Sequence, residues 1–203
     1  MGLLLLTRLG GTEMKRIYNC LIIALIASGI IYGIVSAGNK TQHVVINDYA
    51  SCTDLQQMQE RAQFIVEGHF MPSTGTWNMA RDDFDNSKES QKYYTEGILY
   101  PFNVENVLKG DVPDTLTIIQ RHTDNYSGKT TVDGYYFDID CSKKYIVFLY
   151  YNEEFDHYYA GFVPWAIRVE NEIVYLEGVN KNTMIEDTVT GSSYQDTLNV
   201  ICP

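Results

Sequence analysis

Residues 145–151 read Tyr-Ile-Val-Phe-Leu-Tyr-Tyr, an uninterrupted apolar and aromatic run that is typical of a central strand in a β sheet. Other segments alternate apolar and polar residues, which is the pattern of a strand with one buried face. The clearest examples are Phe64–Phe70 (FIVEGHF) and Thr115–Arg121 (TLTIIQR). We therefore expect a sheet that contains these three strands, with residues 145–151 inside it.

Weaker strand patterns fill much of the remaining chain. They cover residues 93–107, 158–162, 167–169 and 173–176. Pro101 marks a bulge or an edge within the first of these, and Glu170-Asn171-Glu172 predicts a hairpin turn between the last two. The count is five to seven strands, with no regular alternation of strand and helix. This favours an all-β barrel or sandwich with small helical additions.

Short helices and two long loops complete the expected domain. Thr53 opens a pattern that resembles a capping box before a helix over residues 54–62, and Ser193 can cap a helix near the C-terminus. Residues 71–92 and 122–134 are polar and irregular, so both are expected to be loops.

The N-terminal segment is expected to lie outside the folded domain. Cys20–Ala37 carries no charge over 18 residues, and Lys15 and Arg16 precede it, a combination typical of an export signal or a membrane anchor. Eighteen helical residues span about 27 Å, nearly the thickness of a bilayer core. Val35-Ser36-Ala37 offers the small residues that a signal peptidase needs, so a cleaved signal peptide and a retained transmembrane helix both stay open. Either one places the following residues on the extracellular side, secreted or at the cell membrane.

The chain is therefore divided into four parts, with its start at Met1 or at Met14. The expected parts are a signal peptide or membrane anchor (1–37), a spacer (38–51), an OB-like β-barrel (52–176) and a C-terminal extension with a short helix (177–203). Within the spacer, Val44-Val45-Ile46 has the composition of a short strand.

Acidic residues dominate the exported part. The whole chain has a formal net charge of −11, and residues 1–37 hold three of its 15 basic and one of its 26 acidic residues. The part beyond residue 37 therefore has 12 basic and 25 acidic residues and a net charge of −13. Nucleic-acid binding needs a surplus of Lys and Arg, so no nucleic-acid partner is expected.

Three cysteines lie beyond the N-terminal segment: Cys52, Cys141 and Cys202. An oxidising compartment favours one disulfide among them with one thiol left over. The pairing stays open between Cys52–Cys141 and Cys52–Cys202. No pair has the C-x-x-C spacing of a redox or zinc site, so no such chemistry is predicted.

Four segments also match a known group in their order along the chain. They are residues 62–68 (AQFIVEG), 102–112 (FNVENVLKGDV), 114–120 (DTLTIIQ) and 143–149 (KKYIVFL). In these segments the chain resembles secreted or membrane-anchored Gram-positive proteins of undefined role, which share the OB-like barrel of netrin modules and tissue inhibitors of metalloproteinases. The match covers about residues 52–176 and implies a five-stranded Greek-key barrel, in agreement with the strand count.

The resemblance implies little about function. In the metalloproteinase inhibitors, the first residue of the mature chain is a cysteine whose amine and carbonyl bind the catalytic zinc. Here Cys52 lies inside the chain, because cleavage after Ala37 leaves Gly38 as the first residue. The resemblance therefore does not extend to that zinc wedge, and it supplies no catalytic residue.

Histidines and carboxylates form no recognised catalytic or metal-binding pattern. His43, His69, His122 and His157 are isolated from one another in sequence. The acidic run Asp82–Asp85 lacks the glycine and the glutamate of an EF-hand loop. No cofactor, metal site or catalytic residue is predicted. A hydrolase reading requires two carboxylates to converge on one pocket from the acidic clusters at 82–85, 138–140 and 153–156.

Tyrosine is the most unusual component, with 16 residues of which many stand in pairs. One member of each pair in a strand faces outward, and exposed Tyr and Trp give binding surfaces a large contact area. The candidate surface consists of Tyr136, Tyr151, Tyr159 and Trp165. We therefore expect a non-enzymatic, inhibitor-like binding module for an extracellular protein or cell-wall partner. The alternatives are a secreted Asp/Glu-dependent hydrolase and a passive envelope protein without a ligand.

Overall fold

The computed structural model describes residues 43–45, 49–126, 128–179 and 184–202. The described residues fall within one compact unit, residues 42–203. The predicted signal peptide or anchor at 1–37 and the choice of start residue lie outside the described residues. In the described ranges, no helix is both long enough and apolar enough to cross a membrane.

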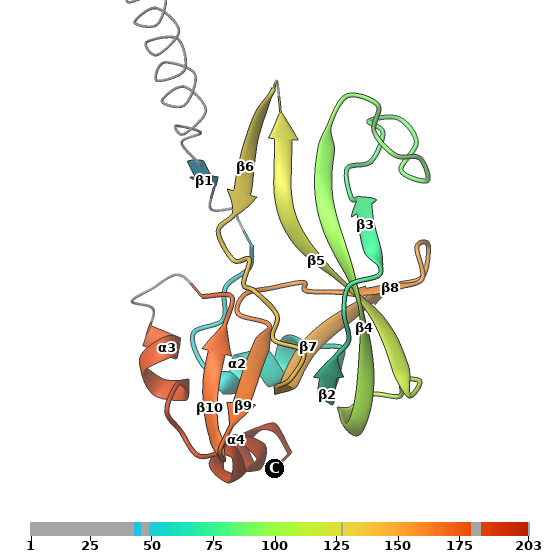
Figure 1. Cartoon of the computed structure of the whole chain (residues 1–203). Helices are drawn as coiled ribbons and strands as arrows, with labels where there is room; N and C mark the ends of the chain where they lie inside the picture. Colours follow the sequence, from blue (N-terminus) through green and yellow to red (C-terminus); the bar gives the residue numbers. More distant parts are fainter. Residues whose placement is uncertain (1–42, 46–48, 127, 180–183, 203) are drawn as a thin grey trace, which may run out of the picture. The chain divides into compact units, whose positions relative to one another are not determined.

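The compact unit is built mainly from strands that belong to one mixed sheet (Figure 1). The strands are β1 (His43–Val45), β2 (Phe64–Phe70), β3 (Gly75–Asn78), β4 (Tyr94–Lys109), β5 (Thr115–Tyr126), β6 (Lys129–Asp133), β7 (Lys144–Asn152), β8 (His157–Tyr159), β9 (Ala166–Glu170) and β10 (Ile173–Glu177). Each segment predicted as a strand contains one, although the strand predicted over 158–162 ends at Tyr159 and Ile46 of the predicted 44–46 strand lies outside the described residues.

Five strands pair in a ring. β2 pairs antiparallel with β4 on one side and with β7 on the other. β4 also pairs antiparallel with β5, and β7 also pairs antiparallel with β8. β8 pairs in parallel with β5 and so closes the ring. The remaining strands extend this ring: β3 pairs with β4, β6 pairs with β5 and carries β1, and β9 and β10 continue outward from β7.

β7 occupies the central place that its apolar sequence predicts, because it lies between β2 and β9 and is buried on both faces. Tyr145, Val147 and Leu149 belong to one core cluster, which also contains Phe70, Phe102 and Trp165. Ile146 and Phe148 point to the opposite face and belong to a second core cluster. The sheet therefore separates two apolar cores.

Three helices contribute to the second core. They are α2 (Leu55–Arg61), α3 (Met184–Val189) and α4 (Tyr194–Ile201). Met58, Val189 and Ile201 are buried in this core. The part expected as a C-terminal extension is thus packed into the same compact unit as the sheet.

Helix caps agree with the sequence, with one shift. Ser193 caps α4 as predicted, accepting a hydrogen bond from the backbone N–H of Asp196. At α2 the cap is Asp54, one residue later than the Thr53 pattern suggested, and its carboxylate accepts from the N–H of Gln57. The Gln57 side chain in turn accepts from the N–H of Thr53, the residue before the cap, so Gln57 bonds back to the start of the helix without forming a full capping box.

Both predicted loops contain a strand. Residues 71–92 include β3, which pairs with β4 from Gly75↔Leu99 to Asn78↔Glu96. The prediction of a loop over 122–134 is wrong, because β5 continues to Tyr126 and forms a hairpin with β6. These strands lie toward the margin of the sheet, where a polar sequence is compatible with pairing.

Part of the expected spacer at 38–51 also joins the domain. β1 pairs in parallel with β6. Further on, the N–H of Val163 donates to the carbonyl of Ala50, and the N–H of Cys52 donates to the carbonyl of Val163. The chain is therefore fixed to the domain before α2 begins.

Candidate functional site

The four aromatic residues expected to form a binding surface do not form one patch. Trp165 is only 3% exposed and packs in the core cluster with Phe70 and Phe137, which corrects its placement on the surface. Its backbone carbonyl accepts a hydrogen bond from the N–H of Phe148 on β7, so the backbone of Trp165 lies directly beside the sheet. Tyr136 is partly exposed, and its ring contacts His122 at 4.5 Å between centroids.

Tyr151 and Tyr159 lie on neighbouring strands but face opposite sides of the sheet. The register pairs Tyr150 with Tyr159 and Tyr151 with Tyr158, and directly opposed residues share a face. The Tyr151 hydroxyl donates to Asp156 at 2.7 Å. Of the four predicted residues, Tyr159 alone lines a pocket that lies between β3 and the β7–β8 turn.

This pocket has a volume of about 230 Å³. One side is formed by β3 and the residues that follow it up to Arg81, and the other side by the turn that joins β7 to β8. Its lining includes Trp77, Arg81, Ile119, Phe155, His157 and Tyr159. Three of these residues are aromatic or heteroaromatic side chains at or near the β7–β8 turn. Ile119 of β5 and Tyr159 of β8 come from strands of the ring, so the pocket joins two chain segments that are far apart in sequence.

Stacked rings and a guanidinium form one wall of the pocket. The rings of Trp77 and His157 stack with centroids 5.2 Å apart and an interplanar angle of 22°. Phe155 lies 5.0 Å from Trp77. The Arg81 guanidinium carbon lies 4.2 Å from the centre of the Trp77 ring and 4.7 Å from the centre of the Phe155 ring, within the range of cation–π attraction.

The β3 side of the pocket is fixed by a buried asparagine at the end of that strand. Asn78 is 8% exposed, and its side-chain oxygen accepts from the N–H groups of Ala80 at 3.0 Å and Thr95 at 3.1 Å. Its amide group donates to the carbonyls of Ser90 and Tyr93. These four bonds satisfy a buried polar side chain and set the direction in which the chain leaves β3 toward Arg81.

The opposite side is fixed by the turn between β7 and β8. The side-chain oxygen of Asn152 accepts from the N–H groups of Glu154 and Phe155 at 3.0 and 3.3 Å. Asp156 adopts a positive φ of 54°, a conformation that Asn and Asp tolerate better than most residues. The turn therefore presents Phe155 and His157 toward Trp77.

The floor of the pocket depends on a glycine in β4. A Cβ atom at Gly97 would lie 2.5 Å from the Cδ1 atom of Ile119 and 2.8 Å from the Cγ atom of Met79. Both neighbours line the pocket. A side chain at residue 97 would therefore push into the space that the pocket occupies.

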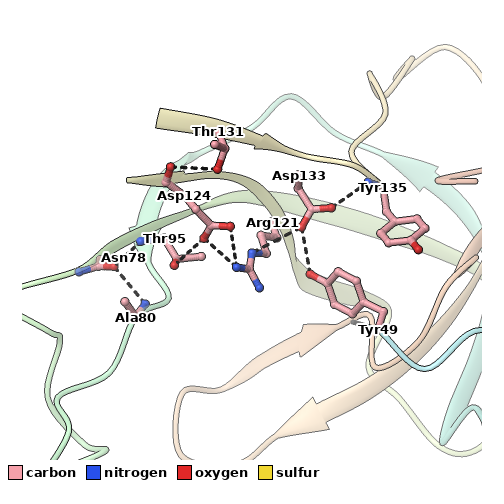
Figure 2. Close-up of polar contacts among 9 residues, drawn as sticks. All are labelled: Tyr49, Asn78, Ala80, Thr95, Arg121, Asp124, Thr131, Asp133 and Tyr135. Atoms are coloured by element: carbon pink, nitrogen blue, oxygen red, sulfur yellow. Dashed lines mark hydrogen bonds and ion pairs between the residues drawn. The ribbon is translucent and has the colours of Figure 1, made fainter. Parts of the chain in front are cut away.

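A second polar cluster surrounds Arg121 on β5 (Figure 2). Its guanidinium donates to both carboxylate oxygens of Asp124 at 2.7 Å, and its Nε atom lies 3.4 Å from an oxygen of Asp133. Asp133 also accepts from the Tyr49 hydroxyl at 3.2 Å and from the N–H of Tyr135 at 2.8 Å. Burial, together with the Asp133 charge, raises the pKa of Tyr49 to about 12. This cluster attaches the segment before α2 to the sheet.

A third cluster surrounds the buried carboxylate of Glu67 on β2. Lys144 and Asn106 donate to its Oε1 atom at 2.9 and 3.0 Å, and the Tyr194 hydroxyl of α4 donates to its Oε2 atom. Burial alone would raise the pKa of Glu67, but these hydrogen bonds outweigh it and lower the pKa. Because its described bonds are all internal, the cluster joins α4 to the sheet.

The acidic clusters considered for a hydrolase make local contacts at separate places. Asp85 pairs with Lys88 at 2.6 Å, Asp140 accepts from Ser142, and Asp156 accepts from Tyr151. None of the described residues that line the aromatic pocket is a carboxylate. The described residues likewise contain no group of three or more His, Cys, Asp or Glu side chains placed to hold a metal ion.

Cys52, Cys141 and Cys202 are free thiols in the structure, and a disulfide among them in an oxidising compartment stays a prediction. Cys52 is buried in the core that faces the helices, whereas Cys141 packs against the core on the other face of the sheet. Burial raises the pKa of the Cys52 thiol. A buried thiol with a raised pKa is unreactive at neutral pH.

Sequence reasoning identified residues 71–92 as a loop but missed its pocket residues, Trp77 and Arg81. No binding role was predicted either for Phe155 in the β7–β8 turn or for His157 at the start of β8. The only sequence feature that points to this pocket is Trp77, a tryptophan in an otherwise polar segment. The side of the sheet on which Trp77 lies follows from the pairing of β3 with β4, which the sequence does not show. The other predicted loop, 122–134, contributes no described residue to this pocket.

Comparison with known proteins provides no relative: no family model, no curated protein and no solved structure matches the chain.

Proposed function

We propose that β2, β4, β5, β7 and β8 form an OB-like Greek-key barrel related to that of netrin modules. The ring of pairings supports this proposal, because an OB barrel closes when its third and fifth strands pair in parallel. Here β5 and β8 take those two places and pair in parallel at Ile118↔Tyr158 and Ile119↔Tyr159. In this arrangement β3 belongs to the connection between the first two barrel strands, and residues 153–156 form the connection between the last two.

We further propose that the protein is a non-enzymatic binding module on the extracellular side, secreted or attached to the cell membrane by its N-terminal segment. The observation that carries the proposal is the aromatic pocket between β3 and the β7–β8 turn. OB barrels bind their ligands at these two connections and at the strands between them. Concave sites lined by aromatic side chains and a few polar groups are also the usual form of ligand sites. The uncharged run behind Lys15 and Arg16 supports the location.

The test is a ligand-observed NMR screen of small acids, amides, monosaccharides and acetylated dipeptides against the full chain in a nonionic detergent. We expect some fragments to bind the wild-type protein, and we expect this binding to be lost in the Phe155→Ala variant. Tyr136→Ala is the matched control, because it removes a partly exposed tyrosine that lies outside the pocket lining. Thermal unfolding of each variant checks that the fold is retained.

Two results would count against this function. Fragments that bind equally well to the Phe155→Ala protein would place the site elsewhere. A screen without any binding fragment would favour the passive envelope protein over the binding module.

A further inference from the structure

Charge in the pocket is opposite to that of the protein around it. The chain beyond residue 37 carries 25 acidic and 12 basic residues, yet the described lining of the pocket contains Arg81 and no carboxylate. None of the ion pairs among the described residues includes Arg81. The pocket therefore holds a positive charge that forms no ion pair with a described side chain.

Arg81 is held in a fixed orientation. Its Nε–H donates to the Met79 carbonyl at 3.2 Å, and its Nη2 atom donates to the Asn78 carbonyl. A guanidinium has five N–H donors, so others remain for a ligand. The rings of Trp77 and Phe155 cover its surface and reduce its freedom, so less conformational entropy is lost when a ligand pairs with it.

The remainder of the lining is apolar or aromatic. Ile119, Met79 and Tyr159 face the space beside Arg81. Trp77 already stacks with His157 and is covered by Arg81, so its ring is poorly placed to stack on a sugar. A cationic ligand would meet Arg81 and find no carboxylate in the described lining.

We infer that the pocket takes a ligand in which a carboxylate is joined to a small apolar or aromatic body, with the carboxylate paired to Arg81. This inference rests on the proposed function and specifies the chemical class of its ligand. Arginine pairs with carboxylates through parallel, charge-assisted hydrogen bonds. One guanidinium matches a singly charged acid, and the strongly negative protein disfavours a more highly charged anion. Such a ligand is either a free organic acid or the C-terminal carboxylate of a peptide.

The test is isothermal titration calorimetry on the full chain in a nonionic detergent. The probes are N-acetyl-phenylalanine, its uncharged amide, phenyl phosphate, and a tetrapeptide that ends in phenylalanine with a free or an amidated C-terminus. We expect the free acids to bind about tenfold or more tightly than the matching amides, because charged hydrogen bonds are lost in the amides. Binding of the acids should weaken as salt is added, and binding of the amides should not. The relative affinities of the amino-acid derivative and the tetrapeptide distinguish the two sources of the carboxylate.

Arg81→Gln should remove the preference for acid over amide, and Arg81→Lys should retain part of it. Arg61→Gln is the matched control, because Arg61 is exposed on α2 and does not line the pocket. Equal binding of acid and amide that is lost in Phe155→Ala would overturn the inference but leave the proposed function in place. Stronger binding of phenyl phosphate than of the carboxylates, or no binding of any acid up to its solubility limit, would also overturn it.

Discussion

At the residue scale, buried polar side chains hold elements of this structure together in ways that the strand patterns of the sequence do not show. Glu67 sits in a β strand at a position with 1% exposure, where a carboxylate is costly unless it is paired. The cost is offset by donors from three other elements, β4, β7 and α4. The alternation in FIVEGHF predicts one buried face and therefore places Glu67 toward solvent. That prediction is wrong, because Ile65 and Glu67 on the other face are 0% and 1% exposed. The pattern also does not show which donors meet Glu67.

Glu67→Gln is predicted to lower the free energy of unfolding at neutral pH by about 2–3 kcal/mol, because a buried charge pair with Lys144 is broken. The pKa of Glu67 is lowered in the folded state, so the unfolded chain binds the proton more readily. The stabilisation is therefore complete above about pH 4.5, the ordinary pKa of a glutamate, and is lost as the pH falls below it.

Urea unfolding from pH 7 to pH 3 provides the measurement. The difference between wild type and the Glu67→Gln variant should shrink on acidification. Glu170→Gln is the control, because Glu170 pairs with Lys143 and Arg168 at a partly exposed position, where solvent screening makes such pairs weaker than the buried pair of Glu67. A constant difference across this pH range would mean that folding does not lower the pKa of Glu67.

At the element scale, β3 is the strand on which the pocket depends. Its pairing with β4 ends at Asn78, whose four hydrogen bonds hold the chain that follows. The position of Arg81 over the Trp77 and Phe155 rings depends on that short connection. The binding site is thus controlled by one polar residue at the end of a four-residue strand.

Asn78→Ala is predicted to lower stability by about 2–3 kcal/mol, because two partly buried N–H groups lose their acceptor and the buried side chain is removed. It should also weaken binding of any pocket ligand, as Arg81 is released. Asn86→Ala is the matched control, since Asn86 is exposed in the same connection and should change neither property. Thermal unfolding and fragment titration give the two readouts. Unchanged binding by a folded Asn78→Ala protein would show that Asn78 does not position the site.

Strands were predicted correctly where buried side chains make the sequence rich in apolar residues. They were missed where the paired residues are polar. β2 and β7 are buried on both sides, and their segments were predicted with nearly correct ends. β6 and the far part of β5 have polar sequences, so nothing in their composition distinguishes them from a loop. The site shows the same limit, because the sequence predicts Trp165 at the surface and assigns no role to Trp77. Trp165 proves to be buried, and Trp77 lines the pocket.

At the scale of the whole molecule, one sheet carries two cores, and the C-terminal helices belong to the second. Ile201 of α4 is 2% exposed and packs in the same cluster as Met58 of α2. Its neighbour Val200 is 44% exposed. The C-terminal segment therefore stabilises the fold directly, and a truncation before α4 would uncover part of the core.

Ile201→Ser is predicted to destabilise the protein by about 3–5 kcal/mol, because it leaves a cavity and buries a hydroxyl. Val200→Ser, one residue earlier, should cost less than about 1 kcal/mol. Chemical unfolding of both variants measures the difference. Equal, small effects at the two positions would show that α4 is not part of the cooperative unit.

The central claim is that the aromatic pocket binds a ligand, and the two tryptophans of the chain allow it to be tested directly. Their indole N–H groups give two signals in a proton–nitrogen correlation spectrum, which Trp77→Phe assigns. Titration with N-acetyl-phenylalanine should move the Trp77 signal progressively, while the signal of buried Trp165 stays in place. A Trp77 signal that remains fixed throughout the titration, while the acid binds elsewhere or does not bind, would contradict the account.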